Sequence, residues 1–364
     1  MSQHVIVIGA GVIGLQTAIT LLEAKYTVTI IARHWPGDES TEYTSPWAGA
    51  IWRSHAAAGD VERCEWDMES YRVWMRVAEE EPEQAREMGI EKCPISIYSN
   101  DKPTHTPWYA QHVQAYTPIS SPLSPTGHGH TFSSLAINPP TYLSYLHSRA
   151  AHLGATFITA TLPAPLAAAI QTASALTSQA SSDQNTPKHI PIPSIFINAT
   201  GLSAPPLCPT DTSTHPIRGQ TLLATMHPTP TRQILLWDNT TAHGDEITYI
   251  LPRRGTSTFV LGGTKDAGNY DTLPTPRISE AIVARCKRLF AACGQGDVRI
   301  EVLAEQVGFR PGRTGGPRIE VERVDVGRGE KGSVVHCYGH AGGGFQSSIG
   351  CARKVLGLVR ELEL

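Results

Sequence analysis

An apolar run followed at once by three spaced glycines restricts the fold of this chain more than any other segment. Residues 5 to 8 are all apolar, which is typical of a strand buried on both faces of a parallel sheet. Gly9, Gly11 and Gly14 follow as G-x-G-x-x-G and lead into a predicted helix over residues 12 to 24. The segment therefore predicts a strand, a tight turn and a helix whose N-terminus is open to a ligand.

Each glycine has a separate expected role. Gly9 permits the tight turn, Gly11 lets a pyrophosphate approach the backbone, and Gly14 lets the helix lie close to the sheet. The amides at the helix start, at Val12 and Ile13, then face the phosphates. The alternative is a glycine-rich turn that serves packing alone.

The second predicted strand, residues 26 to 32, ends differently from most dinucleotide-binding strands. The acidic residue that usually binds a ribose hydroxyl is absent, and Arg33 follows instead. This weakens an NAD interpretation but permits NADP. We expect Arg33 to contact a phosphate or to stack on adenine.

The composition excludes several classes. The chain has 364 residues, enough for two domains, and its net charge of −3 gives no bulk attraction to nucleic acid or an anionic membrane. No apolar run approaches ~20 residues, and the first strand leaves no room for a signal peptide. We therefore expect an intracellular protein whose seven cysteines are thiols, although a close pair could oxidise. His128 and His130 lack further ligands, so no metal is expected.

The remaining segments alternate between helix and strand signals. Helices are expected over 60–88 (one or two), 139–152, 278–292 and 345–362, and strands over 95–98, 157–162, 194–201, 221–226, 248–252, 258–263 and 333–338. Residues 100–134 suggest a loop, and 164–193 suggest a helix or variable excursion followed by a loop.

A second glycine-rich turn, residues 339–344, precedes the last predicted helix. Arg310, Arg313 and Arg318 stand just before it in a segment rich in glycine and proline, which we interpret as a loop. A guanidinium fork suits a carboxylate substrate, and the alternative is structural contact with loops. A large dinucleotide reaching from the first turn towards the second suits this layout.

These motifs together resemble the FAD-dependent D-amino-acid oxidase family. The matching blocks, spread over nearly the whole chain, are VIVIGAGVIGL, SPWAGAIW, INATG, PIRGQ, YILPR followed by LGGT, VGFRPGR-x-GGPR and HCYGHAGGGFQSSIG. The resemblance implies an α/β fold with a Rossmann-like FAD-binding domain, expected over 1–60, 140–216 and 300–364. It also implies a substrate-binding domain built on an antiparallel sheet, over 61–139 and 217–299.

The resemblance also implies roles for single residues. Arg310 corresponds to the arginine that pairs with the substrate α-carboxylate, Tyr249 to the tyrosine that supports it, and Gly342 to the carbonyl that accepts from the amine. The residues expected to bind FAD are Gly9, Gly11, Val12, Ile13, Gly14, Arg33, Ser45, Trp47, Ala48, Gly49, Gly201, Gly343, Gly344, Phe345 and Gln346. The implied reaction is hydride transfer to flavin N5, giving a 2-oxo acid, ammonia and hydrogen peroxide.

Three residues bear on the choice of substrate. His55 and Lys265 stand where D-aspartate oxidases carry a histidine and an arginine, and Arg53 adds a third cation. We expect D-aspartate and D-glutamate as substrates. Two departures are a lysine at 265, which lacks a bidentate grip, and a glycine at 342 in place of a serine. The alternatives are that His55 and Lys265 are structural or solvated, so that neutral D-amino acids are the substrates, or that the chain is an NAD(P)-binding reductase or sensor.

The resemblance implies a D-amino acid and molecular oxygen as small-molecule partners, with no nucleic acid and no membrane. Members of the family are often homo-oligomers, and no sequence feature here sets the oligomeric state. A peroxisomal location is expected from the family, or otherwise a cytoplasmic one, because the final residues 361–364 do not form a peroxisomal tripeptide.

Overall fold

The computed structural model describes residues 3–100, 105–182, 195–238, 246–327 and 330–363. The chain divides into two compact units, each assembled from separate segments. Unit 1 comprises residues 1–46, 143–215 and 311–364, and unit 2 comprises residues 47–142 and 216–310. The boundary expected after residue 60 lies after Pro46 in this division, and the one expected after residue 299 lies after Arg310.

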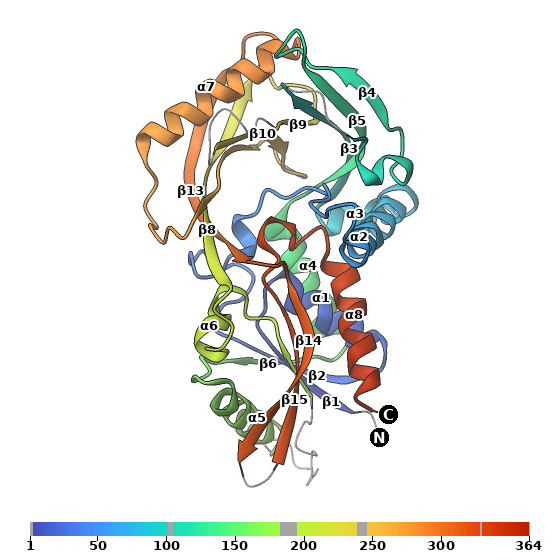
Figure 1. The fold of residues 1–364 in the computed structure, drawn as a ribbon, viewed down its shortest axis with the longest axis vertical. Coiled ribbons are helices and arrows are strands. Elements are labelled where there is room, and N and C mark those ends of the chain that lie inside the picture. The colour runs from blue at the N-terminus through green and yellow to red at the C-terminus, as the bar shows by residue number, and fades with distance from the viewer. Residues whose placement is uncertain (1–2, 101–104, 183–194, 239–245, 328–329, 364) are drawn as a thin grey trace. The chain divides into compact units, whose positions relative to one another are not determined.

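Unit 1 is built on a six-stranded sheet in the order β14-β15-β7-β1-β2-β6 (Figure 1). Its strands are β1 (His4–Ile8), β2 (Thr27–Ala32), β6 (Thr156–Thr159), β7 (Ile195–Asn198), β14 (Arg318–Gly327) and β15 (Glu330–Tyr338). All neighbours are parallel except β14, which runs antiparallel to β15. The first predicted strand, helix and second strand are confirmed as β1, α1 (Val12–Glu23) and β2.

Helices complete unit 1. Ile6 and Ile8 of β1 join Ala169 and Ile170 of α5 (Leu166–Ser182) in one buried cluster, so α5 covers one face of the sheet. Helices α1 and α8 (Ser348–Glu361) pack against each other, and α6 (Ala204–Leu207) follows β7. Of the helix or variable excursion followed by a loop that is expected over 164–193, the structure shows the helix α5, and residues 183–193 lie outside the described residues.

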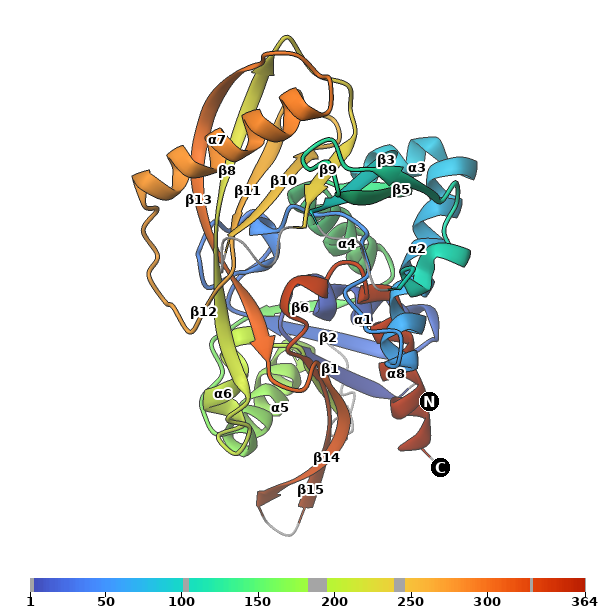
Figure 2. The same ribbon diagram turned by 45° about the horizontal axis from the view of Figure 1, so that its top comes forward.

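Unit 2 is built on a nine-stranded, mostly antiparallel sheet (Figure 2). The strand order is β12-β8-β11-β10-β9-β3-β5-β4, with β13 paired to β8, and β3 runs parallel to β9. The strands are β3 (Ile90–Ser99), β4 (Thr117–Ser120), β5 (His128–Ile137), β8 (Thr214–His227), β9 (Ile234–Trp237), β10 (Glu246–Pro252), β11 (Phe259–Thr264), β12 (Asp266–Ala267) and β13 (Arg299–Arg313).

Helix α7 (Pro276–Ala292) covers one face of this sheet. Its residues Ile282 and Leu289 share a buried cluster with Ile250 of β10 and Leu261 of β11. Because side chains alternate along a strand, Tyr249 is turned to the opposite face. The other helices are α2 (Val61–Glu80), α3 (Pro82–Glu87) and α4 (Pro139–His152), with short 3-10 turns η1 (Ser45–Trp47), η2 (Trp108–Gln111), η3 (Gly201–Ser203) and η4 (Ala341–Gly343).

Two predicted loops are wrong. Residues 128–134, assigned to a loop for their serine, threonine and histidine content, form most of β5 and pair with β3 along its whole length. The segment carrying Arg310 and Arg313 is the end of β13 rather than a loop. Its Gly308 is required by packing, because a Cβ there would lie 2.7 Å from the Cβ of Trp47. Composition misled in both places, since sheet pairing overrides local preference.

Several absences bear on the expected class of protein. Within the described ranges, no helix is long and apolar enough to cross a membrane. All seven cysteines are free. His130 lies in β5 among aromatic rings, with its Nε2 3.0 Å from the hydroxyl of Tyr109, and no cluster of three potential metal ligands occurs in the described part of the chain.

Because one histidine of unit 1 is buried, we expect the folded protein to be less stable at acidic pH. His336 of β15 is fully buried, with Nδ1 3.2 Å from Asn198 Nδ2 and Nε2 3.0 Å from Glu322 Oε2. A neutral ring accepts from Asn198 and donates to Glu322, and burial together with Arg318 lowers the pKa of His336. The unfolded chain therefore takes up a proton near pH 6.5 that the native ring refuses.

We expect the free energy of unfolding to fall as the pH drops from 7 to 5, by at most about 1.4 kcal/mol per pH unit for this histidine. Denaturant titrations at both pH values measure the change. His336→Gln is the control, since it removes the titrating group and should flatten the slope. An equal slope in both proteins would contradict the assignment.

Candidate active site

The three glycines after β1 differ in what their missing side chain allows, which is packing at two positions and room for a ligand at the third. Gly9 has φ +109°, and a Cβ there would lie 2.6 Å from the carbonyl oxygen of Ala199. A Cβ at Gly14 would overlap the carbonyl of Gly9. At Gly11, by contrast, the one neighbour within 4 Å is the hydroxyl of Ser45, at 3.0 Å. Packing explains Gly9 and Gly14, whereas Gly11 keeps open a space that a close-lying ligand can use.

The N-terminus of α1 suits an anion. Gly11 is its N-cap and offers no side chain to the first amides, and no acidic residue stands in the first turn. The amide of Val12 donates to Ser45 Oγ at 3.1 Å, which places Ser45 beside the helix start. Exposed amides and the helix dipole favour a pyrophosphate here, as expected for Val12, Ile13 and Ser45.

The second glycine-rich turn, residues 339–344, leads into the last helix of unit 1. Residues 341–347 form η4 and turns, and α8 begins at Ser348, three residues later than the predicted Phe345. The N-cap Ser347 makes no side-chain cap bond, and no acidic residue lies in the first turn. Gly342 and Gly343 belong to η4, Gly344 follows in the turn, and Phe345 and Gln346 are buried.

Other expected cofactor residues lie in several settings. Arg33 forms an exposed ion pair with Glu42 at 2.7 Å, so its guanidinium already has an acidic partner. Gly201 follows β7 with φ +58°. Trp47, Ala48 and Gly49 begin unit 2, where Trp47 packs on β13. Their assignment to the cofactor stays a prediction.

The open space at Gly11 gives a direct test. We expect Gly11→Ala to fold with nearly unchanged stability, because its backbone at φ −71° suits alanine, yet to lose bound flavin by about tenfold or more. Flavin absorbance per mole of purified protein measures the loss, and thermal unfolding checks the fold. Gly14→Ala is the contrasting variant and should lose stability. Full flavin retention in Gly11→Ala would contradict the role of this space.

Arg310 is held in place at the end of β13. A Cβ on Gly219 of β8 would lie 2.5 Å from Arg310 Nη1, so the guanidinium lies directly on the bare glycine. Nη1 also donates to the carbonyl of Thr264 at 3.1 Å. Arg313 and Arg318 have acidic partners, Asp211 at 2.9 Å and two glutamates, whereas no carboxylate in the described residues pairs with Arg310. Of the three predicted arginines, Arg310 is the one available to a substrate carboxylate.

Tyr249 completes a carboxylate-binding pair. It stands opposite Gly262 in the β10–β11 hairpin, and its ring occupies the space that a Cβ of Gly262 would take. Arg310 lies close enough to its hydroxyl to lower the pKa of Tyr249. Burial raises the pKa of Tyr249, and Arg310 opposes that rise only in part, so the hydroxyl stays protonated and can donate at neutral pH.

The positive charge of Arg310 lowers the pKa of both Lys265 and His55. The pKa of Lys265 is lowered by burial, then by the charges of Arg53 and Arg310. The pKa of His55 is lowered by the surrounding protein, then by Arg53, Lys265 and Arg310. Both side chains nevertheless remain accessible to solvent. Unit 2 therefore brings together the three residues predicted for the substrate side chain, with His55 neutral at pH 7.

Arg53 differs from Lys265 because it is already paired. Its Nη2 lies 2.5 Å from Asp238 Oδ2, and it hydrogen-bonds to Tyr109. Neither Asp238 nor Tyr109 was among the predicted site residues. The signal that could have found Asp238 is its position directly after the apolar run of β9, where a strand ends in a charged residue.

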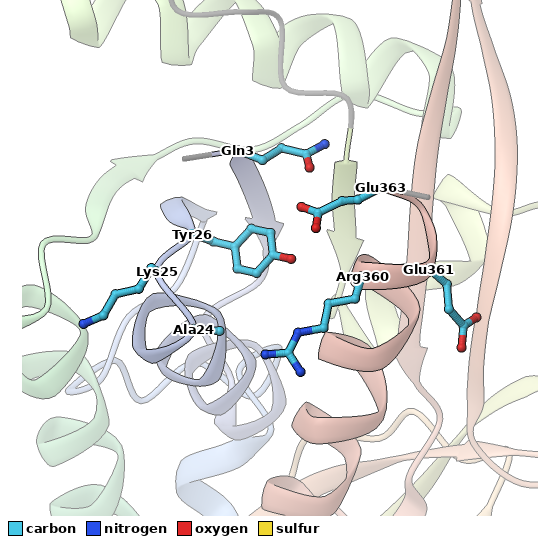
Figure 3. A pocket seen from close by; sticks show the side chains of 7 residues that line it. All are labelled: Gln3, Ala24, Lys25, Tyr26, Arg360, Glu361 and Glu363. Carbon is cyan, nitrogen blue, oxygen red and sulfur yellow. The ribbon is translucent and has the colours of Figure 1, made fainter. Parts of the chain in front are cut away.

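A cavity of about 550 Å³ lies elsewhere on unit 1 (Figure 3). The hydroxyl of Tyr26 points between Arg360 and Glu363, and burial with Glu363 raises its pKa while Arg360 lowers it. Gln3 and Tyr26 immediately precede β1 and β2, so the cavity lies at the amino ends of these strands. Ligands of such sheets bind at the carboxyl ends, where Gly9 and Gly201 lie.

The chain is similar to known proteins over nearly its whole length. The family model described as FAD dependent oxidoreductase matches residues 4–357. A D-amino-acid oxidase from Fusarium vanettenii is 32% identical over 99% of this chain and 97% of that protein. A D-aspartate oxidase from Talaromyces thermophilus is 27% identical over 100% of this chain and 96% of that protein. The solved glycine oxidase from Bacillus cereus is similar in fold, with a TM-score of 0.68 and 15% identity, covering 99% of this chain and 96% of that one.

Proposed function

Because the chain belongs to the family of FAD-dependent oxidoreductases, we propose that it oxidises D-amino acids and prefers those with an acidic side chain. The observation that carries the preference is the charge of the site in unit 2. Arg310 and Lys265 form no ion pair with a carboxylate in the described residues, and Asp238 forms its ion pair with Arg53. Two unpaired cations match the two carboxylates of D-aspartate or D-glutamate, whereas a neutral substrate leaves one cation uncompensated.

The α-carboxylate is assigned to Arg310 and Tyr249. The guanidinium is fixed by Gly219 and by the carbonyl of Thr264, and its remaining N–H groups can donate to a carboxylate. Tyr249 adds a hydroxyl donor from β10. Because both donors are preformed, the substrate loses little binding free energy to side-chain ordering.

The distal carboxylate is assigned to Lys265 and His55. Lys265 supplies a positive charge, and the neutral His55 ring supplies one N–H donor. This arrangement penalises neutral substrates, since they leave Lys265 without a counter-charge. The identity of the relatives does not decide the matter, because D-amino-acid oxidases and D-aspartate oxidases both cover the whole chain.

The FAD cradle is assigned to Gly11, Val12 and Ser45 at the start of α1, with the turn before α8 near the ring. The space at Gly11 and the start of α1, which has no acidic residue in its first turn, fit this group. Bound FAD would supply a hydride acceptor for the substrate α-carbon and a route for the two electrons to oxygen, which becomes hydrogen peroxide. The resulting imino acid would be hydrolysed by water to a 2-oxo acid and ammonia. The family match also removes the nicotinamide alternative that Arg33 left open. A role of Gly342 towards the amine, a peroxisomal location and a homo-oligomer stay predictions from the resemblance.

Peroxide production on D-aspartate and D-alanine, measured side by side on the yellow protein, tests the proposal. We expect kcat/KM for D-aspartate to be at least about tenfold higher, with no turnover of L-aspartate. A preference for D-alanine would assign the enzyme to neutral D-amino acids and overturn the role of Lys265. Absence of peroxide with both would overturn the oxidase assignment.

A further inference from the structure

We propose that Asp238 sets how strongly the site favours acidic over neutral substrates, by holding Arg53 in an ion pair and reducing the positive charge that a substrate meets. The inference rests on the proposed function of the site in unit 2. It assigns a specificity role to a residue that neither the motifs nor the resemblance singled out.

Hydrogen bonds fix the backbone beside both members of the ion pair. Asp238 follows β9 directly, and its amide donates to the carbonyl of Tyr98 at 2.7 Å. On the other side, the amide of Trp52 donates to Leu135 at 2.9 Å, just before Arg53. The side chains of Arg53 and Asp238 are only 20% and 32% exposed. The pair is therefore held in one place and partly shielded from solvent screening.

Both members of the pair act on the residue assigned to the distal carboxylate. In the register of β9 against β10, Leu236 stands opposite Tyr249, so Asp238 lies two residues from that position. The pKa of Lys265, which Arg53 lowers and Asp238 raises, agrees with this closeness. Asp238 is thus a carboxylate belonging to the protein that competes with the distal carboxylate of the substrate for the same cations. The Nε of Arg53 is buried without a partner in the described residues, which leaves this guanidinium with an unused donor.

Removing either partner should change selectivity in opposite directions. Asp238→Asn keeps the size of the side chain and frees the charge of Arg53, so the ratio of kcat/KM for D-aspartate to that for D-alanine should rise about tenfold. Arg53→Gln leaves Asp238 as an uncompensated negative charge, so the ratio should fall about tenfold. A bridge that served only the fold would impair both substrates in the same direction in both variants.

A binding measurement separates selectivity from turnover. On the holoenzyme, calorimetric titration with succinate and with propionate compares a dicarboxylate with a monocarboxylate of similar chemistry. The succinate preference should rise in Asp238→Asn, fall in Arg53→Gln, and return towards wild type in the double variant, where neither charge is present.

The outcomes distinguish the two proposals. A wild-type preference for D-alanine overturns the proposed substrate class, yet the ratios in the variants still test Asp238, because only their shift matters. Unchanged ratios, or shifts of the same sign in Asp238→Asn and Arg53→Gln, overturn the inference. If Asp238→Asn does not fold, Arg53→Gln and the double variant decide it, since only a charge effect restores the ratio when the second charge is removed.

Discussion

Replacing Arg310 by methionine is expected to lower kcat/KM for every D-amino-acid substrate on the order of a thousandfold, with FAD still bound. Loss of one partner of a buried, hydrogen-bonded charge pair costs about 2–5 kcal/mol, and each 1.4 kcal/mol is tenfold. The effect falls on acidic and neutral substrates alike, because both carry the α-carboxylate. Steady-state kinetics with D-aspartate and D-alanine measure it.

Arg313→Met is the matched control for this prediction. Arg313 lies on the same strand three residues later, but it belongs to unit 1 and pairs with Asp211 at 2.9 Å. We expect this variant to lose stability and to keep near wild-type kcat/KM in the folded fraction. A comparable kinetic loss in both variants would show that Arg310 acts through the strand rather than through the substrate.

The local signals in the sequence are enough to predict much of the fold. Residues 5–8 and the glycine spacing predict β1 and the start of α1 because burial on both faces and a phosphate-sized turn require those residue types. The strands predicted over 248–252 and 258–263 are confirmed as β10 and β11, which pair antiparallel with Tyr249 opposite Gly262. Such pairings follow from strand register alone.

Contacts between distant segments could not be predicted in this way. The sequence shows three arginines in one short segment but not which of them has an acidic partner, since Asp211 and Arg313 are about a hundred residues apart. The pairing of Arg53 with Asp238 is hidden for the same reason. Strands β5 and β13 were missed because their polar residues and glycines suit contacts with segments distant in the sequence. Gly308, for example, leaves room for the side chain of Trp47.

The largest change in selectivity is expected from Lys265→Met. This variant keeps the length and the apolar stem of the side chain but removes the charge assigned to the distal carboxylate. We expect kcat/KM for D-aspartate to fall about a hundredfold, while that for D-alanine changes less than about threefold. A hundredfold change corresponds to about 2.7 kcal/mol, within the range for breaking a substrate ion pair that is partly shielded from water.

Two further variants decide whether the charge itself is responsible. Lys265→Arg keeps the charge and adds a second donor, so it should retain at least wild-type preference for D-aspartate. Lys92→Met removes an exposed lysine of unit 2 that pairs with Glu79, and it should leave both substrates unaffected. An equal fall in kcat/KM for D-aspartate and D-alanine in Lys265→Met would mean that Lys265 supports the site without contacting the substrate side chain. In that case Arg310 and Lys265 do not select a dicarboxylate.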